Sequence, residues 1–349
     1  QVDIKDCSHD IPFISLFKRV LNKTVFCVHC EVCEVECPTG ALSVVPLVKV
    51  NASKCIHCHR CLTFKDNGCV AANSIRKTST MINNESNMNV FSIKKFNTFG
   101  LRNSWIQQYY KTPETFLTQE AKDYLNVKKQ LPIFTNWLMS AGLVDSKDKS
   151  QTELSKILAD YLTTDSALFW QMLWVNLCFD NELCLWFSAN IGYDRLYLRE
   201  DLTALMEHTF NTVPESSRDN ALKSLLNTFN ETPLGNNMNI GRVIKTGNKV
   251  SVRRSPLNDV SLPVMAYSLY RYAEKTGRHS LTVSELYNSE QTDGIVRQFG
   301  IEREPLEQTL RSLEQDVNHV LRAELKMGLD NIILREDLTS EDIIKLMLK

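Results

Sequence analysis

The sequence lacks a large net charge of either sign, a long uninterrupted hydrophobic run and a glycine-rich nucleotide-binding loop. Its 349 residues carry 40 basic and 41 acidic side chains, so nucleic-acid binding would have to rest on local charge clusters. The most apolar stretch, residues 167–187, is interrupted by Gln171, Asn176, Asp180, Asn181 and Glu182. This stretch predicts a pair of buried helices and not a membrane span.

Two further absences narrow the functional classes. No GxGxxG or Walker sequence is present, so the chain offers no recognisable nucleotide site. No signal peptide is visible, and the cysteine usage described below favours a reducing, cytoplasmic setting. The chain begins at Gln1 without methionine, from which we expect a cleaved, trimmed or excised amino terminus; whether a catalytic domain lies upstream is left open by the sequence. A hydrophobic content of 43% predicts a buried core and two or three domains.

Eight of the eleven cysteines fall in two runs that have iron-sulfur spacing. The first run is C-x2-C-x2-C-x3-C-P, the spacing of bacterial two-cluster ferredoxins, in which the fourth thiolate serves the other cluster. Its members are Cys27, Cys30, Cys33 and Cys37. The second run repeats the first three intervals at Cys55, Cys58 and Cys61, and its fourth member, Cys69, comes late.

A cubane cluster takes three thiolates from one tight loop and a fourth from a distant point of the chain. Two neighbouring clusters can therefore exchange their fourth ligands. The spacing predicts two 4Fe-4S clusters with these ligand sets: Cys27, Cys30, Cys33 and Cys69 for one, and Cys55, Cys58, Cys61 and Cys37 for the other.

Alternative uses of these cysteines fit the spacing less well. Zinc ribbons need only two ligands from each loop, so two consecutive triplets are awkward for a tetrahedral ion. C-x2-C spacing is also poor disulfide geometry. The histidines among the ligands, His29, His57 and His59, are interpreted as flanking residues that tune potential or solvent access.

The predicted fold class is α+β: a two-cluster ferredoxin-like domain followed by a mainly helical region that ends in a winged-helix-like domain. The expected boundaries are 1–77 for the ferredoxin-like domain, 78–89 for a polar linker, 90–235 for a helical domain and 236–349 for a basic hairpin with the winged helix. All five tryptophans lie between residues 105 and 186, and their helical spacing predicts core positions and no cofactor site.

A basic segment from residue 241 to 256 alternates like two strands around a Thr246-Gly247-Asn248 turn. It contains no acid and has five cations: Arg242, Lys245, Lys249, Arg253 and Arg254. Such a hairpin can lie against phosphates, although solvated lysines also protect sheet edges. Both interpretations stay open at this stage.

The last ninety residues predict a winged helix. The first helix is expected over residues 263–275. A capping-box sequence at Thr282 predicts the start of a second helix, and Pro305 predicts the start of a third, because proline is favoured at the first helical position. In the third helix the expected buried stripe is Leu306, Leu310, Leu313 and Val317, with Gln308, Arg311, Ser312 and Gln315 facing outward. Arg311 is the candidate base-reading residue, but four nearby glutamates repel phosphate, and many winged helices bind only protein.

A family resemblance follows from these segments. NKTVFCVHCEVCEVECPTGAL and KCIHCHRCLTFKDNGCVAANSI resemble the ferredoxin-like tail of bacterial phosphoadenosine phosphosulfate reductase-like proteins. The stretch from FNTFGLRNSWIQQYY through LPIFTNWLMSAGLV is similar to a helical domain of unknown function found with those proteins. The reductase-like proteins are adenine-nucleotide alpha hydrolases, with relatives in DNA sulfur modification and phage defence. Their Ser-Gly-Gly-rich phosphate loop is missing from this sequence.

Two functional hypotheses result. The first is an electron-transfer or structural iron-sulfur module, without a catalytic site of its own, that works with a reductase-like nucleotide-binding domain or subunit in a DNA-modification or antiphage assembly. The second is a redox-sensing DNA-binding regulator whose clusters control the winged helix. Sensor clusters tend to lack a ligand, so two complete cysteine sets favour the first hypothesis.

Overall fold

The computed structural model describes residues 31–45, 48–56, 61, 93–288, 291–326 and 329–348. The chain divides into two compact units, Gln1–Met88 and Asn89–Lys349. Their boundary falls inside the segment predicted as a linker, residues 78–89, which itself lies outside the described residues. The part of the chain from residue 89 onward is one unit, and its predicted division near residue 235 stays a prediction.

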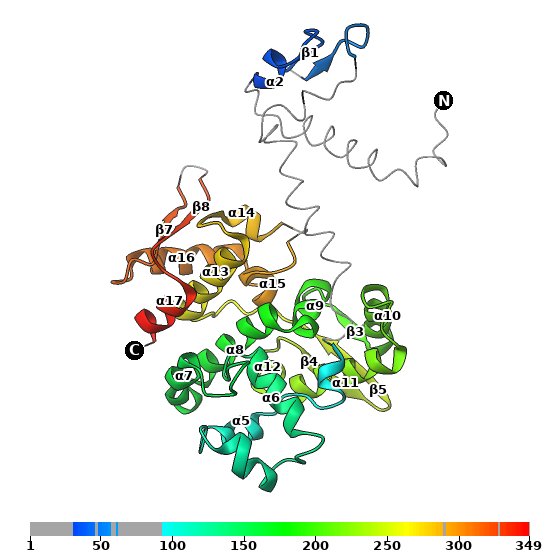
Figure 1. Cartoon of the computed structure of the whole chain (residues 1–349), viewed down its shortest axis with the longest axis vertical. Coiled ribbons are helices and arrows are strands. Elements are labelled where there is room, and N and C mark those ends of the chain that lie inside the picture. Colours follow the sequence, from blue (N-terminus) through cyan, green and yellow to red (C-terminus); the bar gives the residue numbers. More distant parts are fainter. Residues whose placement is uncertain are drawn as a thin grey trace. The chain divides into compact units, whose positions relative to one another are not determined.

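The described part of the smaller unit holds one short helix and one two-stranded antiparallel sheet (Figure 1). These elements are α2 (Val32–Val35), β1 (Leu42–Ser43) and β2 (Lys49–Val50). A carboxylate oxygen of Glu34 in α2 accepts a hydrogen bond from the backbone N–H of Val44, 3.0 Å away. This bond fastens the loop of the first cysteine run to the small sheet.

The larger unit is a mixed α and β structure in which helices outnumber short antiparallel strands (Figure 1). Its helices before the first sheet are η2 (Ile93–Phe96), α5 (Asn103–Tyr109), η3 (Phe116–Glu120), η4 (Ala121–Asp123), α6 (Leu131–Ser140), α7 (Glu153–Thr164), α8 (Ser166–Asp180) and α9 (Glu182–Asn190). The next elements are β3 (Leu196–Leu198), α10 (Arg199–Thr209), α11 (Glu215–Glu231), α12 (Pro233–Asn236), β4 (Arg242–Thr246) and β5 (Lys249–Arg253). The last are α13 (Leu262–Thr276), β6 (Ser280–Thr282), α14 (Val283–Leu286), α15 (Ile295–Phe299), α16 (Arg303–Gln315), β7 (Leu321–Glu324), β8 (Asn331–Leu334) and α17 (Ser340–Met347).

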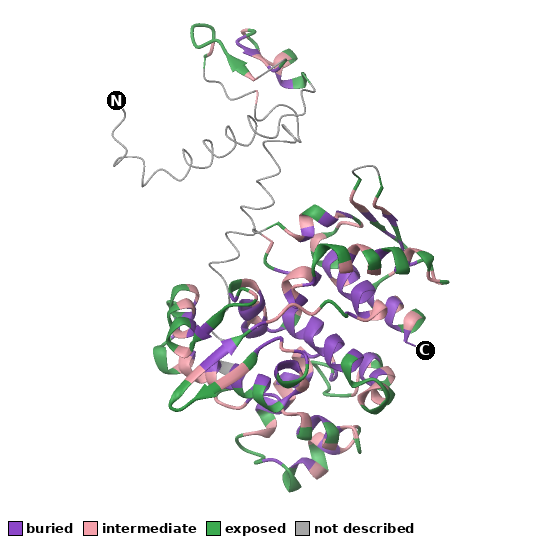
Figure 2. Cartoon of the chain, turned by 180° about the vertical axis from the view of Figure 1, so that it is seen from behind, coloured by how far each residue is buried: buried purple, intermediate pink, exposed green. Residues whose placement is uncertain are grey.

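Helix α8 is the centre of the larger unit. Every residue from Leu168 to Cys178 is buried, as expected for a helix that is apolar on all sides. Buried residues concentrate along this helix and α13 (Figure 2). The prediction that the tryptophans belong to the core is confirmed, since each of the five is at most 5% exposed. Cys178 and Cys184 are buried thiols of the same core.

Local capping signals set where α7, α8 and α9 begin. The side chains of Thr152, Asp165 and Asn181 each accept a hydrogen bond from a backbone N–H in the first turn of the following helix. Asn181 also separates α8 from α9, so the apolar stretch 167–187 is a helix pair, as predicted. No helix in the described part of the chain is long and apolar enough to span a membrane.

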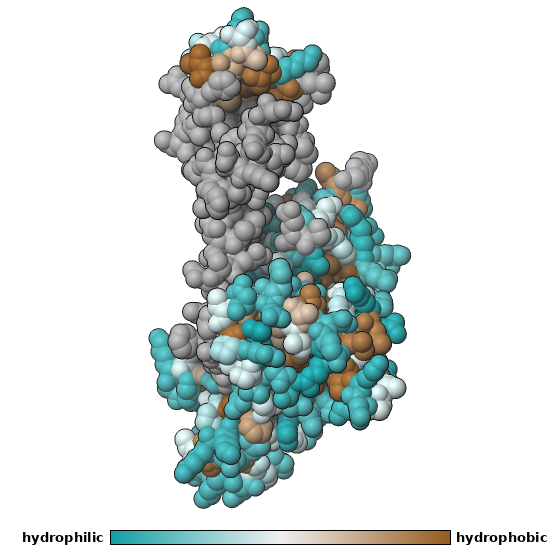
Figure 3. Space-filling model, turned by 90° about the vertical axis from the view of Figure 1, so that its right-hand side faces the viewer, coloured by the Kyte–Doolittle hydropathy of each residue, from teal (hydrophilic) through white to brown (hydrophobic). Residues whose placement is uncertain are grey.

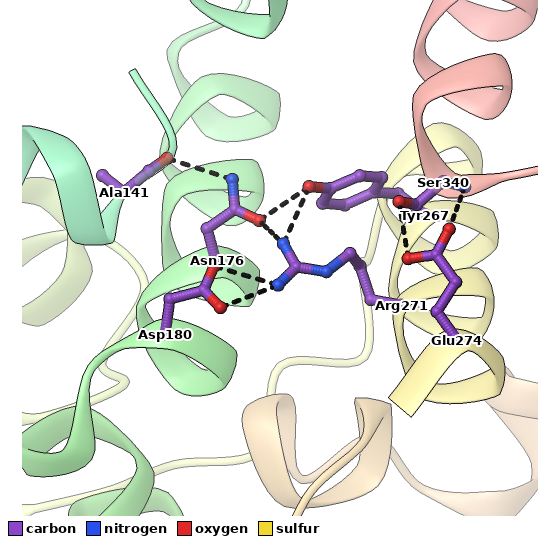
Figure 4. Close-up of polar contacts among 7 residues, drawn as sticks. All are labelled: Ala141, Asn176, Asp180, Tyr267, Arg271, Glu274 and Ser340. Atoms are coloured by element: carbon purple, nitrogen blue, oxygen red, sulfur yellow. Dashed lines mark hydrogen bonds and ion pairs between the residues drawn. The ribbon is translucent and has the colours of Figure 1, made fainter. Parts of the chain in front are cut away.

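A polar network joins α8 to α13 inside the larger unit (Figure 4). The amide oxygen of Asn176 accepts from the Tyr267 hydroxyl at 2.7 Å and from Arg271 at 2.6 Å. Arg271 also binds both carboxylate oxygens of Asp180 at 2.9 Å, while the Asn176 amide N–H donates to the carbonyl of Ala141. Because these bonds satisfy each partner, polar side chains are tolerated at a helix contact.

The first sheet of the larger unit has the order β3-β5-β4, and both pairings are antiparallel. The predicted basic hairpin is confirmed as β4 and β5, with Thr246 opposite Lys249. The turn therefore has two residues, and Gly247 at its first position has φ 59°, a left-handed value that glycine adopts at little cost. The third strand, β3, was not predicted.

The carboxyl-terminal elements agree with several sequence predictions. The expected helices are present as α13, α14 and α16, and the side chain of Thr282 caps α14 by accepting from the Glu285 N–H. Strands β6, β8 and β7 form a second antiparallel sheet in that order. Thr339 caps α17 through a reciprocal box with Asp342.

Two details of the third predicted helix were wrong. Helix α16 begins at Arg303, two residues before Pro305. It ends at Gln315, so Val317 lies beyond the helix and is 86% exposed. The other members of the expected stripe, Leu306, Leu310 and Leu313, are buried.

Candidate iron-sulfur site and basic hairpin

Four of the eight candidate ligands lie among the described residues: Cys33, Cys37, Cys55 and Cys61. Cys27, Cys30, Cys58 and Cys69 lie outside them, as do His29, His57 and His59. The described cysteines form no disulfide. Within the described residues, no three His, Cys, Asp or Glu side chains are grouped so that they could hold a metal. Three members of the first predicted ligand set and one member of the second lie outside the described residues. The three described members of the second set, Cys37, Cys55 and Cys61, are not grouped closely enough to hold a metal.

Cysteine side chains from both runs pack in one small hydrophobic cluster. Buried Cys33, on α2, packs with Leu42 and Val44, and the half-buried Cys37 and Cys61 lie against the same group. Cys55 is half-buried and belongs to no such cluster. The structure therefore brings together one thiol of the first predicted ligand set with two thiols of the second.

Backbone hydrogen bonds surround the Cys37 thiol. The N–H of Ala41 points at its sulfur from 3.3 Å, and the Thr39 hydroxyl lies 3.7 Å from it. The backbone N–H of Thr39 is the main cause that lowers the pKa of Cys37 below its ordinary value. A lowered pKa favours the thiolate, which is the form that binds metal. Hydrogen bonds to sulfur also tune cluster potentials.

The two buried core cysteines have the opposite environment. Burial raises the pKa of the Cys178 thiol to about 12 and raises that of Cys184 as well. Both thiols stay protonated and inert in the hydrophobic core. The prediction that Cys178 and Cys184 are core residues is therefore confirmed.

The cations of the predicted basic hairpin point to different sides of the sheet. Arg242, Lys245 and Lys249 are exposed, and none of these three forms an ion pair with another described residue. Arg253 is half exposed and pairs with Asp194 at 3.3 Å. These four cations remain available to a partner at the surface.

Arg254 was predicted as a phosphate contact, and this prediction was wrong. Its side chain is fully buried. One guanidinium nitrogen donates to the carbonyls of Ser188 and Ile191 at 3.0 and 2.8 Å. The other donates to the Tyr193 hydroxyl at 2.5 Å and to the carbonyls of Arg297 and Gln298. Because both terminal nitrogens are engaged inside the protein, Arg254 is a structural residue.

Arg311, the candidate base-reading residue, is exposed on α16 but is paired within its own helix. Its guanidinium lies 3.6 Å from a carboxylate oxygen of Glu307. Arg303 reaches the same glutamate at 2.9 Å. Glu307 pairs with both arginines, and Asp330 lies 3.9 Å from Arg303 as a second carboxylate, so the positive charge of this face is balanced, which weakens the case for DNA contact here.

A second group of cations was not foreseen from the sequence. Arg199, at the start of α10, and Lys223, on α11, line a pocket together with Lys245 of the hairpin. These residues come from three elements spread over 47 positions of the sequence, so no local pattern could have grouped them.

Taken together, the fold defines a mixed α and β protein with an amino-terminal cysteine-rich unit and a larger helical unit. No family model matches the sequence, and no curated protein matches it. Two solved structures have a similar fold. One, described as "Magnesium ion-bound SspB crystal structure", aligns with a TM-score of 0.53 and 15% identity over 74% of this chain and 93% of that chain. The other, "SspB crystal structure", aligns with a TM-score of 0.52 and 14% identity over 74% and 88%. At such low identity the likeness concerns the fold alone.

Proposed function

We propose that the chain is an iron-sulfur module that holds two 4Fe-4S clusters in its amino-terminal unit. The observation that carries the proposal is the packing of cysteine side chains from both runs, Cys33, Cys37 and Cys61, on one hydrophobic cluster. The hydrogen-bonded sulfur of Cys37 supports it, because this cysteine is the predicted exchanged ligand. A ferredoxin-like fold for this unit is part of the proposal.

We further propose that the carboxyl-terminal elements form a winged helix. The order of elements supports this: α13, β6, α14, α16, β7 and β8 run as helix, strand, helix, helix, strand, strand, with α15 between α14 and α16. The sheet order β6-β8-β7 places the last strand in the middle, between the first and the second. Because Glu307 and Asp330 pair with the outward arginines of α16, this helix is better suited to a protein partner than to a major groove.

The biological role rests on the sequence resemblance. The module would transfer electrons to, or stabilise, a reductase-like nucleotide-binding domain or subunit in a bacterial DNA-modification or antiphage system. Electron transfer requires clusters that survive repeated reduction and oxidation. If the clusters break down after a single reduction, a structural role is the better description.

Metal analysis tests the cluster proposal directly. After purification without oxygen, two 4Fe-4S clusters should give about eight iron and eight acid-labile sulfide per chain. Stoichiometric zinc with little iron would refute the assignment. Paramagnetic resonance of the reduced protein should show two interacting clusters.

Single substitutions test the exchange of fourth ligands. Cys37→Ser and Cys69→Ser should each damage one cluster, namely the one whose other three ligands come from the opposite run. Cys7→Ser is the matched control, because Cys7 lies outside both runs and should leave iron content and both resonance signals unchanged. If Cys69→Ser also preserves both signals, Cys69 is not a ligand and the two-cluster arrangement has to be revised.

A further inference from the structure

A pocket lies between α11 and the hairpin of the larger unit, and the inference drawn from it does not rest on the clusters. It encloses about 120 Å³, which is well above the roughly 10–15 Å³ that one water molecule needs. Val243, Lys245 and Val250 form the hairpin side of the pocket. Val243 and Lys245 share one face of β4 because side chains two residues apart point the same way, and Val250 is the registered partner of Lys245.

The charges around this pocket are unbalanced. Among the described residues that line it, three are basic, Arg199, Lys223 and Lys245, and none is acidic. Asp219 stands beside the pocket, paired with Lys223 at 2.7 Å and with Arg199. The hydrogen bond from Lys223 is the main cause that lowers the pKa of Asp219, so this acid stays ionised at neutral pH. The Asp219 carboxylate is thus shared by Arg199 and Lys223, and Lys245 has no ion-pair partner among the described residues.

We propose that this pocket binds a phosphate group. Cations gathered in one concave site repel one another unless an anion lies between them. A phosphate supplies several charged oxygens, which match the planar fork of Arg199 and the point charges of the two lysines. The valines offer an apolar wall for the carbon atoms of an attached sugar. A phosphate group attached to a sugar is present both in a free nucleotide and in the backbone of a nucleic acid.

The surroundings favour the nucleic-acid backbone as the source of the phosphate. Arg242 and Lys249 lie on the opposite face of the hairpin from Lys245, and both are exposed. A strand that wraps around β4, an edge strand of the sheet, would meet the pocket on one face and these two cations on the other. The side of the larger unit that faces the viewer in Figure 3 is mostly hydrophilic, with small hydrophobic patches between the polar residues.

The full-length chain and its Lys223→Gln, Lys245→Gln double variant test the proposal. Binding of a short fluorescein-labelled single strand is followed by anisotropy over a range of salt concentrations, and binding of adenosine monophosphate and of inorganic phosphate by calorimetry. We expect the double variant to weaken phosphate-dependent binding by about tenfold or more. For the labelled strand, its salt slope should fall by about 1 to 1.4, since each phosphate contact contributes about 0.7.

The matched control is Lys156→Gln. The side chain of Lys156 on α7 is 60% exposed and lies 3.9 Å from Glu153 within its helix, so Lys156→Gln removes one positive charge from another part of the larger unit, where the double variant removes two from the pocket. Asp219→Asn removes the opposing carboxylate and should tighten binding. Tryptophan fluorescence should show that the lysine variants keep the wild-type unfolding midpoint.

The outcomes separate the two sources of phosphate. Binding of the strand alone, lost in the double variant, identifies the nucleic-acid backbone, whereas binding of adenosine monophosphate or phosphate alone, lost in the same variant, identifies a small phosphate ligand. The proposal is overturned if no probe binds at low salt, or if Lys156→Gln weakens binding as much as the double variant. A folded Asp219→Asn protein that loses binding would also overturn it.

Discussion

Arg253 and Arg254 are adjacent in sequence but should respond very differently to truncation. Arg254 is fully buried, and its guanidinium stacks on the ring of Tyr193 with 4.2 Å between its carbon and the ring centroid. Arg253 is half exposed and has a single ion pair, to Asp194. Replacing each by alanine therefore compares a buried arginine with an exposed one at neighbouring positions of the same strand region.

The cost of Arg254→Ala follows from the groups it would leave behind. Two carbonyls, those of Ser188 and Ile191, would lose the hydrogen bonds from Arg254, at about 1 kcal/mol or more each for a buried group. The carbonyls of Arg297 and Gln298 would still accept from Tyr193 and Trp174, respectively. Loss of the aromatic stacking adds about 1 kcal/mol, while relief from burying a charge offsets part of the total. We expect the free energy of unfolding to fall by about 3 to 5 kcal/mol.

Urea denaturation followed by tryptophan fluorescence measures this effect in the larger unit, because all five tryptophans belong to it. With a slope of about 3 kcal/mol/M, Arg254→Ala should lower the midpoint by about 1 M or more. Arg253→Ala should cost no more than about 1 kcal/mol. If Arg254→Ala fails to fold, Arg254→Lys, which keeps the charge but has fewer donors, should give a folded protein of intermediate stability. Equal stability of the two alanine variants would refute the reasoning.

Two further predictions concern backbone packing and pH. Gly100→Ala should destabilise the larger unit by more than about 3 kcal/mol or prevent its folding, since an added Cβ would lie 2.4 Å from backbone atoms of Ser224 and Thr228 on α11; a urea midpoint equal to wild type would contradict this. The hydrogen bond from the Thr339 side chain lowers the pKa of Asp342, so the cap of α17 contributes stability above the ordinary aspartate pKa and loses it as pH falls through the lowered folded-state value. Amide hydrogen exchange should therefore show that protection at the start of α17 falls below about pH 4. The fall should be larger in the wild type than in Thr339→Ala. Protection that does not change with pH would contradict this prediction.

The sequence by itself determined the features that depend on neighbours within a few residues. The spacing of the cysteine runs is one such feature, and it carries the cluster proposal without help from the fold. The β4-β5 hairpin is another, because Gly247 and the alternation around it specify the turn locally. The helix caps at Thr282 and Thr339 also follow from side chains that bond to backbone three residues away.

Only the tertiary structure decided which cations are available at the surface. The burial of Arg254 depends on α9 and α15, which are distant in sequence and supply its carbonyl partners. One local signal could have separated it from Arg253: side chains alternate along a strand, so Arg254 shares the inner face of buried Val252. The pocket of Arg199, Lys223 and Lys245 had no such signal. Its charges come together because packing of α10, α11 and β4 places them side by side, and packing is a property of the whole unit and not of any one segment.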